Sequence, residues 1–155
     1  TARFVLVGER YSSKPESLAF EASLREQTLR EPLAGKVEFA GHVDDPCQRL
    51  GEWTTVVSAS RQEPLSRVLL EALSGGRVCV ATDVGGTRQV LGDGRLGWIV
   101  RPGDHEGLAD AMIASTIEAD RRAFIAREGP KWIESEFSFK RQHASLQQVY
   151  REILK

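Results

Sequence analysis

Short apolar runs alternate with longer, helix-length segments along this chain, and that alternation restricts the fold more than any other feature. Strands separated by helices pair in parallel through right-handed crossovers. The pattern therefore predicts an α/β fold, a Rossmann-like parallel sheet in a three-layer α/β/α arrangement. The strand-length runs are Phe4–Val7, Val37–Ala40, Thr54–Ser58, Val78–Thr82 and Gly97–Val100.

The segments between these runs carry helix signals. Pro15–Arg30 is polar with spaced leucines and alanines, which is typical of a helix with one packing face. Asp44–Pro46 has the acid and the proline of a helix start. Val68–Leu73 is apolar and ends at Gly75-Gly76, a helix stop. Two further helices are expected, at His105–Ile117 and Phe139–Leu154, with Pro130 interrupting the region between them.

The composition limits the class of protein. The 155 residues suffice for one domain with a buried core. A net charge of −1 gives no general attraction to nucleic acid or to an anionic membrane. No apolar run approaches the ~20 residues that span a bilayer, and no signal peptide is apparent. Cys47 and Cys79 fit reduced thiols, so we expect a cytoplasmic protein without a transmembrane segment or a nucleic-acid partner.

Glycine and polar residues follow the predicted strands at the points where they end. In a parallel sheet these carboxyl ends meet at one edge, where ligands bind. We therefore expect the post-strand segments to line one edge of the sheet. They are Gly8-Glu9, Gly41–Val43, Ser60–Ser66 and Asp83–Thr87.

Two carboxylates, Glu63 and Glu71, stand eight positions apart in the third of these segments and the helix that follows. Glu63 is expected in a turn and Glu71 on the apolar helix. Backbone N–H groups near Ser66 and Arg67, at the helix start, are suited to an anion. A neighbouring carboxylate can accept hydrogen bonds from sugar hydroxyls. Together these groups suit a phosphorylated sugar donor.

Residues 63–72, which read EPLSRVLLEA, resemble the E-x7-E signature of the retaining GT-B glycosyltransferases. Ser66 replaces the glycine that is commoner there. The resemblance extends over nearly the whole chain, and its other fragments occur in the family's order. They are FVLVGE at 4–9, VEFAGHV at 37–43, VATDVGG at 80–86, GWIV at 97–100, PGD at 102–104 and VYRE at 149–152.

The resemblance implies a role for each matching residue. The residues that would bind the donor sugar and phosphate are Gly8, Glu9, Glu63, Pro64, Leu65, Ser66 and Arg67. The run from Pro64 to Arg67 would do so through its backbone amides. Those that would bind the nucleoside are His42, Val43 and Glu71, and those in a donor-facing loop are Gly85 and Gly86. The alternatives at these positions are solvated surface glutamates and plain turn glycines. The resemblance implies no metal, no cofactor and no catalytic residue within this set.

Two other patterns are rejected as sites. Gly92–Gly97 fits G-x-G-x-x-G by letter, but it precedes a strand, whereas the dinucleotide fingerprint follows one and opens a helix. It is interpreted as a turn. Asp44-Asp45 is not a D-x-D metal clamp. The dispersed Lys and Arg residues are interpreted as a solvated surface.

The resemblance identifies residues 1–155 as a group 1 glycosyltransferase C-terminal domain, the donor-binding half of a GT-B fold. It would lack the family's first strand, an Arg/Lys pair that stabilises the leaving diphosphate, and the N-terminal acceptor domain. The implied function is retaining transfer of a hexosyl group from a nucleoside-diphosphate sugar to an acceptor hydroxyl. The isolated chain is expected to be inactive, with the acceptor-binding domain supplied elsewhere. The alternatives are a non-catalytic remnant or interaction module with a GT-B half-fold, and part of a sugar-nucleotide 2-epimerase.

Two expectations concern assembly. The sheet should be five-stranded, in the order 37–41, 2–7, 54–58, 78–82, 97–100, with strands 2–7 and 54–58 pairing directly or through a neighbouring chain. Phe137, Phe139 and Tyr150 are expected to be exposed near the last helix. Exposed apolar patches often mark interfaces, so a homodimer is predicted.

Overall fold

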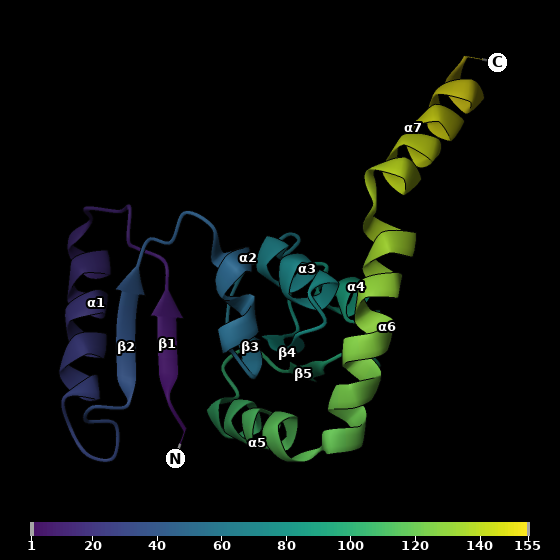
Figure 1. The fold of residues 1–155 in the computed structure, drawn as a ribbon. Helices are drawn as coiled ribbons and strands as arrows, with labels where there is room; N and C mark the ends of the chain where they lie inside the picture. The colour runs from purple at the N-terminus through teal and green to yellow at the C-terminus, as the bar shows by residue number, and fades with distance from the viewer. Residues whose placement is uncertain (1, 155) are drawn as a thin grey trace. The chain divides into compact units, whose positions relative to one another are not determined.

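A computed structural model describes residues 2–154, and the chain divides after Pro46 into two compact units (Figure 1). The first unit contains a two-stranded parallel sheet, formed by β1 (Phe4–Val7) and β2 (Val37–Gly41). Helix α1 (Pro15–Thr28) connects these strands, with Pro15 in its first turn. None of the described residues of α1 is fully buried.

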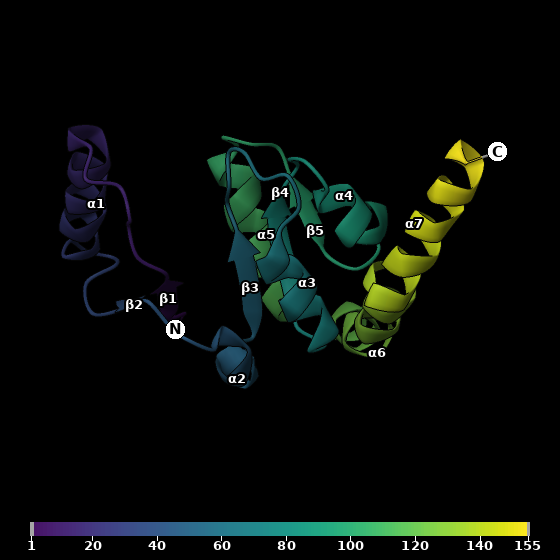
Figure 2. The ribbon, with the colours of Figure 1, turned by 90° about the horizontal axis from the view of Figure 1, so that it is seen from above.

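The second unit is built on a three-stranded parallel sheet in the order β3-β4-β5. Its strands are β3 (Thr55–Ser58), β4 (Val78–Thr82) and β5 (Trp98–Val100). Figures 1 and 2 show helices α3 (Arg67–Ser74) and α5 (His105–Ile117) on opposite faces of this sheet. All of β4 is buried, as expected for a central parallel strand covered on both faces. This unit therefore has the three-layer α/β/α arrangement.

Shorter helices and a long C-terminal pair complete the second unit. They are α2 (Pro46–Arg49), η1 (Leu50–Glu52), α4 (Thr87–Val90), η2 (Gly92–Gly94), α6 (Ala119–Phe137) and α7 (Phe139–Ile153).

The buried core of the described chain lies in the second unit and includes residues of its three strands and of α3, α4, α5 and α6. Leu69 and Leu73 of α3 and Ile125 of α6 are fully buried. Helix α6 approaches α3 closely at Gly129, where an added Cβ would lie 2.8 Å from Cδ1 of Leu73. The loops after β3 and β4 therefore extend from strands that are packed into this core.

The prediction of a single five-stranded sheet is wrong, because the strands form one two-stranded and one three-stranded sheet. Three of the expected neighbours are paired, β1 with β2, β3 with β4 and β4 with β5, but β1 forms no ladder with β3. The resemblance expects a further strand between β1 and β3, and no segment within residues 2–154 supplies one. Each of these two strands therefore keeps one edge without a strand partner in the described chain.

Pro130 does not interrupt the chain as predicted, because it lies inside α6. A proline inside a helix costs about 3 kcal/mol, since its missing N–H cannot bond the carbonyl one turn earlier. Helix α6 withstands this cost through its packing on both sides of the proline. Ile125 and Gly129 are buried before it, and Trp132 and Ile133 pack against the core after it.

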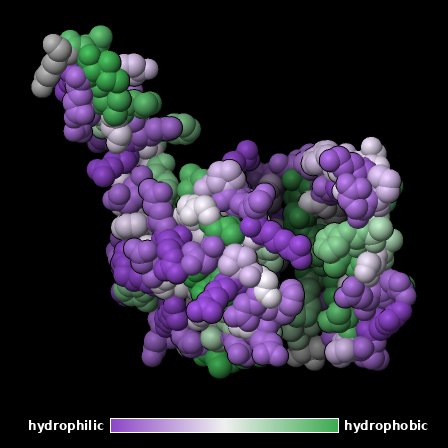
Figure 3. Space-filling model, turned by 180° about the vertical axis from the view of Figure 1, so that it is seen from behind, coloured by the Kyte–Doolittle hydropathy of each residue, from purple (hydrophilic) through white to green (hydrophobic). Residues whose placement is uncertain are grey.

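Helix α7 is amphipathic, and none of its residues is buried. Its apolar side chains gather along one part of the helix (Figure 3, upper left). Phe139 and Tyr150 are exposed as predicted, but Phe137 packs partly buried against the core at the end of α6. No helix within residues 2–154 is long and apolar enough to cross a membrane.

Candidate functional site

The loops after β3 and β4 meet at the carboxyl edge of the second unit's sheet. The backbone N–H of Gly86 donates to the carbonyl oxygen of Pro64 at 2.8 Å. Pro64 has no N–H of its own, so its predicted role as an amide donor to the ligand is wrong. Its carbonyl oxygen makes the contact instead, and this contact joins the segment around Glu63 to the loop that contains Gly85 and Gly86.

The residue before Gly86, Gly85, shows why the loop at this contact needs glycine. Its φ is +48°, and an added Cβ would lie 1.8 Å from the carbonyl oxygen of Glu63. At Gly86, an added Cβ would lie 2.6 Å from Cδ1 of Leu65. A side chain at either position would displace the loop that carries Glu63. The structure thus brings together Glu63, Pro64, Leu65, Gly85 and Gly86.

Thr82, which is absent from the sequence-based prediction, fixes the start of the loop that carries Glu63. Its hydroxyl is at the buried end of β4 and donates to the carbonyl oxygen of Ser60 at 2.5 Å. The next residue, Asp83, donates its N–H to the carbonyl oxygen of Val100 at 2.7 Å. A threonine that ends an otherwise apolar strand, directly before a turn, is the signal that marks it.

Helix α3 begins at this edge with free amide groups. Ser66 is buried and is the N-cap, and its Oγ accepts from the N–H of Leu69 at a long 3.5 Å. The helical ladder starts with the N–H of Leu70, which donates to the carbonyl oxygen of Ser66 at 3.2 Å. The N–H groups of Arg67 and Val68 have no hydrogen-bond partner in the described chain. They are the donors that a helix start offers to an anion.

The two glutamates differ in their surroundings. Glu63 is half-buried, and its carboxylate has no hydrogen bond or ion pair to any of residues 2–154. The Glu71 carboxylate lies 3.7 Å from Nη2 of Arg67, one turn earlier on α3. The Arg67 side chain is 88% exposed, so this long pair holds Glu71 weakly. Both carboxylates are therefore available to a ligand's hydroxyl groups.

A nearby cation, Arg88, is already engaged. Its Nε and Nη2 donate to Oδ2 of Asp83 at 3.1 and 2.6 Å. These hydrogen bonds to Asp83 raise the pKa of Arg88. The guanidinium is consequently held by the loop's own carboxylate.

In the first unit, Gly8 and Glu9 follow β1. The N–H of Gly8, at a φ of +117°, donates to the carbonyl oxygen of Gly41 at 2.7 Å. This bond joins the carboxyl ends of β1 and β2. Glu9 is exposed, and its side chain has no hydrogen bond or ion pair among the residues described.

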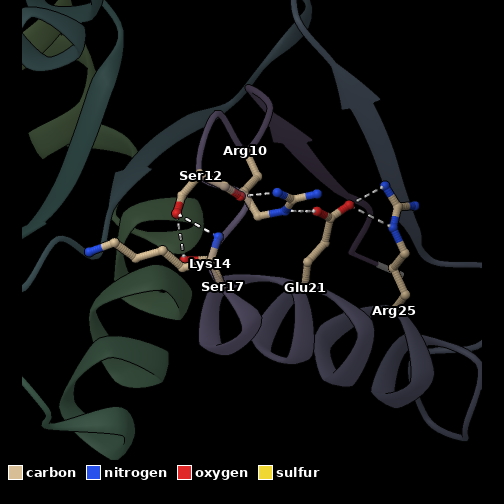
Figure 4. Close-up of polar contacts among 6 residues, drawn as sticks. All are labelled: Arg10, Ser12, Lys14, Ser17, Glu21 and Arg25. Carbon is tan, nitrogen blue, oxygen red and sulfur yellow. Dashed lines mark hydrogen bonds and ion pairs between the residues drawn. The ribbon is translucent and has the colours of Figure 1, made fainter.

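Polar contacts hold the segment after Glu9 against α1 (Figure 4). Oε2 of Glu21 lies 2.9 Å from Nε of Arg10, and Oε1 accepts from Nε and Nη2 of Arg25 at 3.1 and 3.0 Å. The hydrogen bonds from Arg10 and then Arg25 lower the pKa of Glu21. The network restrains the path of the chain beyond Gly8 and Glu9.

His42 and Val43 follow β2 directly. Nε2 of His42 lies 3.3 Å from Oδ1 of Asp44, and both side chains are largely exposed. Val43 is half-buried. His42 and Val43, like Gly8 and Glu9, are predicted site residues that lie at the carboxyl ends of the first unit's strands.

The segment Gly92–Gly97 is a turn that leads into β5, as predicted. Arg121 of α6 donates through Nη2 to the carbonyl oxygens of Gly94 and Gly97, at 3.0 and 2.9 Å. Its guanidinium also lies 3.9 Å from the centroid of the Trp98 ring. Arg121 is therefore structural, which corrects its interpretation as a solvated surface residue. The described residues contain no group of three or more His, Cys, Asp or Glu side chains that could hold a metal ion.

Comparisons with known proteins agree with this architecture. The sequence family described as glycosyl transferases group 1 matches residues 1–116. A lipopolysaccharide core biosynthesis glycosyltransferase of Rhizobium meliloti, LpsE, is 33% identical over 106 residues, which are 68% of this chain and 31% of LpsE. A phosphatidyl-myo-inositol mannosyltransferase of Mycobacterium leprae is 37% identical over 95 residues, covering 57% of this chain and 25% of the mannosyltransferase.

Solved structures share the fold. The Anabaena protein Alr3699/HepE, crystallised with UDP, superposes with a TM-score of 0.84 at 24% identity, over 96% of this chain and 41% of the Anabaena chain. The predicted GT-B half-fold is thereby confirmed. The chain spans less than a third of the two curated relatives named above and about two fifths of this structural neighbour.

Proposed function

Because the chain belongs to the group 1 glycosyltransferases, whose family pattern matches residues 1–116, we propose that it is the nucleotide-sugar-binding domain of such an enzyme. The enzyme transfers a hexosyl group, with retention, from a nucleoside-diphosphate sugar to an acceptor hydroxyl. The observation that carries the proposal is the meeting of the loops after β3 and β4. It sets the unpaired Glu63 carboxylate and the open N–H groups of Arg67 and Val68 on adjoining segments.

Each group has a distinct role in this proposal. The Glu63 carboxylate accepts hydrogen bonds from the donor sugar's hydroxyls, and Glu71 accepts them from the ribose. The amides of Arg67 and Val68, at the positive end of α3, bind the diphosphate. Gly85 and Gly86 keep the loop closed without adding side chains over the ligand. Leu65 and Ser66 shape the segment between the two glutamates.

The family resemblance gives proposed roles to four residues of the first unit as well. Gly8 and Glu9 approach the diphosphate and sugar, and His42 and Val43 border the base. That role rests on the family resemblance and on their position at the carboxyl ends of β1 and β2. Neighbouring structures that contain UDP and UDP-glucose support a nucleoside-diphosphate sugar as the ligand class.

We propose further that this polypeptide alone does not transfer sugar. Transfer requires an acceptor held against the anomeric carbon, and positioning of that kind is worth ~7–11 kcal/mol. Stabilising the leaving diphosphate also requires fixed cations. Arg88 is held by Asp83, and Arg67 is exposed to solvent. The acceptor-binding domain and the missing cations would be supplied elsewhere.

Two other functions make different predictions. A non-catalytic remnant or interaction module would bind a nucleotide weakly or not at all. A portion of a 2-epimerase would bind a nucleotide sugar but belong to an enzyme that inverts C2. The buried thiol of Cys79 is free of any disulfide in the described chain, which supports a reducing compartment. We therefore place the proposed transferase domain in the cytoplasm.

The experiment that tests the proposal is a calorimetric titration of the chain with UDP, GDP, ADP and their sugar conjugates. We expect one nucleotide class to bind with a dissociation constant no tighter than roughly 100 μM. Mass spectrometry of mixtures with sugar acceptors should show slow donor hydrolysis at most. Absence of binding by every nucleotide would contradict the donor-domain assignment. Turnover near ~10 per second would contradict the proposed inactivity.

A further inference from the structure

A hollow of about 330 Å³ opens in the second unit where β3 and β4 begin. Its lining comes from η1 and the residues just before β3, from the residues just before β4, and from α6. The loops that carry Glu63 and Gly85 follow the opposite ends of the same strands. The hollow is therefore at the amino edge of the sheet, separate from the proposed donor site.

Two buried donors in this lining have no partner. Nε1 of Trp53 and Nε of Arg77 are shielded from solvent, and neither donates a hydrogen bond to any group within residues 2–154. Leaving such a donor unsatisfied is costly, and most buried polar groups in folded proteins are paired. An indole N–H and a guanidinium can only donate, so the missing partner is an acceptor.

The charge around the hollow is also unbalanced. Arg77 and Arg122 both line it, and neither has an ion pair among the residues described. The one carboxylate in the lining, that of Glu52, accepts from Nε and Nη2 of Arg49 at 3.1 and 3.0 Å. The two remaining guanidinium groups have the planar, forked donors that match an oxyanion.

The backbone holds this arrangement in place. The N–H of Arg77 donates to the carbonyl oxygen of Ala72 at 2.8 Å. Gly76, at a φ of +68°, lets the chain pass close to α6, because an added Cβ would lie 2.9 Å from the carbonyl oxygen of Ala126. The start of β4 and the face of α6 that carries Arg122 are thus packed directly against each other.

We propose that this hollow binds a phosphate-type dianion. Arg77 and Arg122 balance its charge, and a small shift of the lining opens the shielded Nε1 of Trp53, which then donates to one of the anion's oxygens. The site is independent of the proposed nucleotide-sugar site, and either can fail without the other.

The test is a titration of the ¹⁵N-labelled chain with inorganic phosphate at constant ionic strength, followed through the tryptophan indole N–H signals. Trp53→Phe assigns the signal of Trp53. That signal should shift and saturate, whereas the Trp132 signal should stay still because its Nε1 already donates to the carbonyl oxygen of Val90 at 3.0 Å. A Trp53 signal that does not move, or one that acetate moves to the same saturation, would overturn the proposal.

Matched variants locate the binding. Arg77→Gln and Arg122→Gln should each weaken phosphate binding roughly tenfold, the loss expected for a charge-assisted contact. Arg151→Gln, an equal charge change on exposed α7, should leave it unchanged. Nucleotide binding, where it occurs, should be unaffected by Arg77→Gln. If Arg77→Gln unfolds the chain, Arg122→Gln and Trp53→Phe still decide whether phosphate binds in the hollow. Equal phosphate affinity in the wild type, Arg122→Gln and Trp53→Phe would contradict the site.

Discussion

The N–H of Gly86 donates a 2.8 Å hydrogen bond to the carbonyl oxygen of Pro64, which joins the loops that follow β3 and β4. Pro64 adjoins Glu63, and Gly86 is the N-cap of α4. A parallel sheet brings its carboxyl ends to one edge, and this bond locks two of its loops together there. The position of the Glu63 segment consequently depends on a glycine pair 22 residues further along the chain.

Gly85→Ala should disturb that segment more than a backbone effect alone would. A left-handed φ costs a non-glycine residue roughly 1–2 kcal/mol. At Gly85 the new Cβ would also overlap the carbonyl oxygen of Glu63. We expect a lower free energy of unfolding and weaker nucleotide binding, measured by denaturant titration and calorimetry.

Gly103→Ala is the matched control, because Gly103 has a φ of +84° but no atom within 4 Å of an added Cβ. It should show only the backbone cost and keep the wild-type nucleotide affinity. If the two variants lose the same stability and the same affinity, the close approach at Gly85 has no role.

Arg121→Lys should destabilise the chain by about 1.5–3 kcal/mol, the range for hydrogen bonds to charged groups. A lysine cannot reproduce the planar contacts of the guanidinium with the carbonyl oxygens of Gly94 and Gly97 and with the Trp98 ring. Chemical denaturation measures the change. Arg127→Lys is the control, since Arg127 is exposed and pairs with the adjacent Glu128. Equal stability of the two variants would contradict the structural role.

Cys79 predicts a pH dependence of stability. Burial raises the pKa of its thiol from 9.0 to about 12. Between these values the unfolded chain releases a proton that the folded chain keeps. The contribution of the protonated thiol to stability is therefore fully present below pH 9 and is lost as the pH rises towards 12. The difference in unfolding free energy between the wild type and Cys79→Ala should shift against the wild type across that range. Parallel curves would show that the thiol is not buried.

Helix α7 carries the prediction of a homodimer. Leu146, Val149, Tyr150 and Ile153 are exposed on it at helical spacing. Light scattering at high micromolar concentration should give a dimer mass, and Leu146→Asp should reduce it to a monomer. Gln147→Asp, which adds the same charge at a polar position, should remain dimeric. A monomer mass for the wild type would rule the homodimer out.

Local sequence signals predicted most elements correctly. Helix α5 has the predicted bounds, His105–Ile117, because Asp104 caps it by accepting from the N–H of Gly107 at 2.8 Å. Helix α3 begins after Ser66 and ends before Gly75, as its cap and its glycines indicate. Each of these signals lies within a few residues of the element that it sets.

The features that sequence reasoning missed depend on residues distant in the chain. Thr82 bonds to Ser60 and Trp132 bonds to Val90, and nothing next to either residue marks its partner. Pro130 lies within α6 because its neighbours pack against the core, a tertiary effect that outweighs local propensity. The predicted pairing of β1 with β3 rests on the need to fill an edge, which is not a property of either strand's sequence, and the two strands are not paired.

The most direct test of the donor site compares variants of Glu63 and Glu71 by calorimetry with a nucleoside diphosphate and its sugar conjugate. Glu71→Ala should weaken both ligands, because the ribose loses an ionised acceptor. Glu63→Ala should weaken mainly the sugar conjugate. Each lost charge-assisted contact corresponds to at least roughly a tenfold change in the dissociation constant.

Glu134→Ala is the control for these variants, because Glu134 is an exposed glutamate on α6 without a hydrogen bond or ion pair in the described chain. It should bind both ligands as the wild type does. Glu63→Ala should abolish the preference for the sugar conjugate, while Glu71→Ala should weaken both ligands alike. If the wild type binds measurably and both substitutions match Glu134→Ala in every titration, the nucleotide sugar does not bind at the loops joined by Pro64 and Gly86.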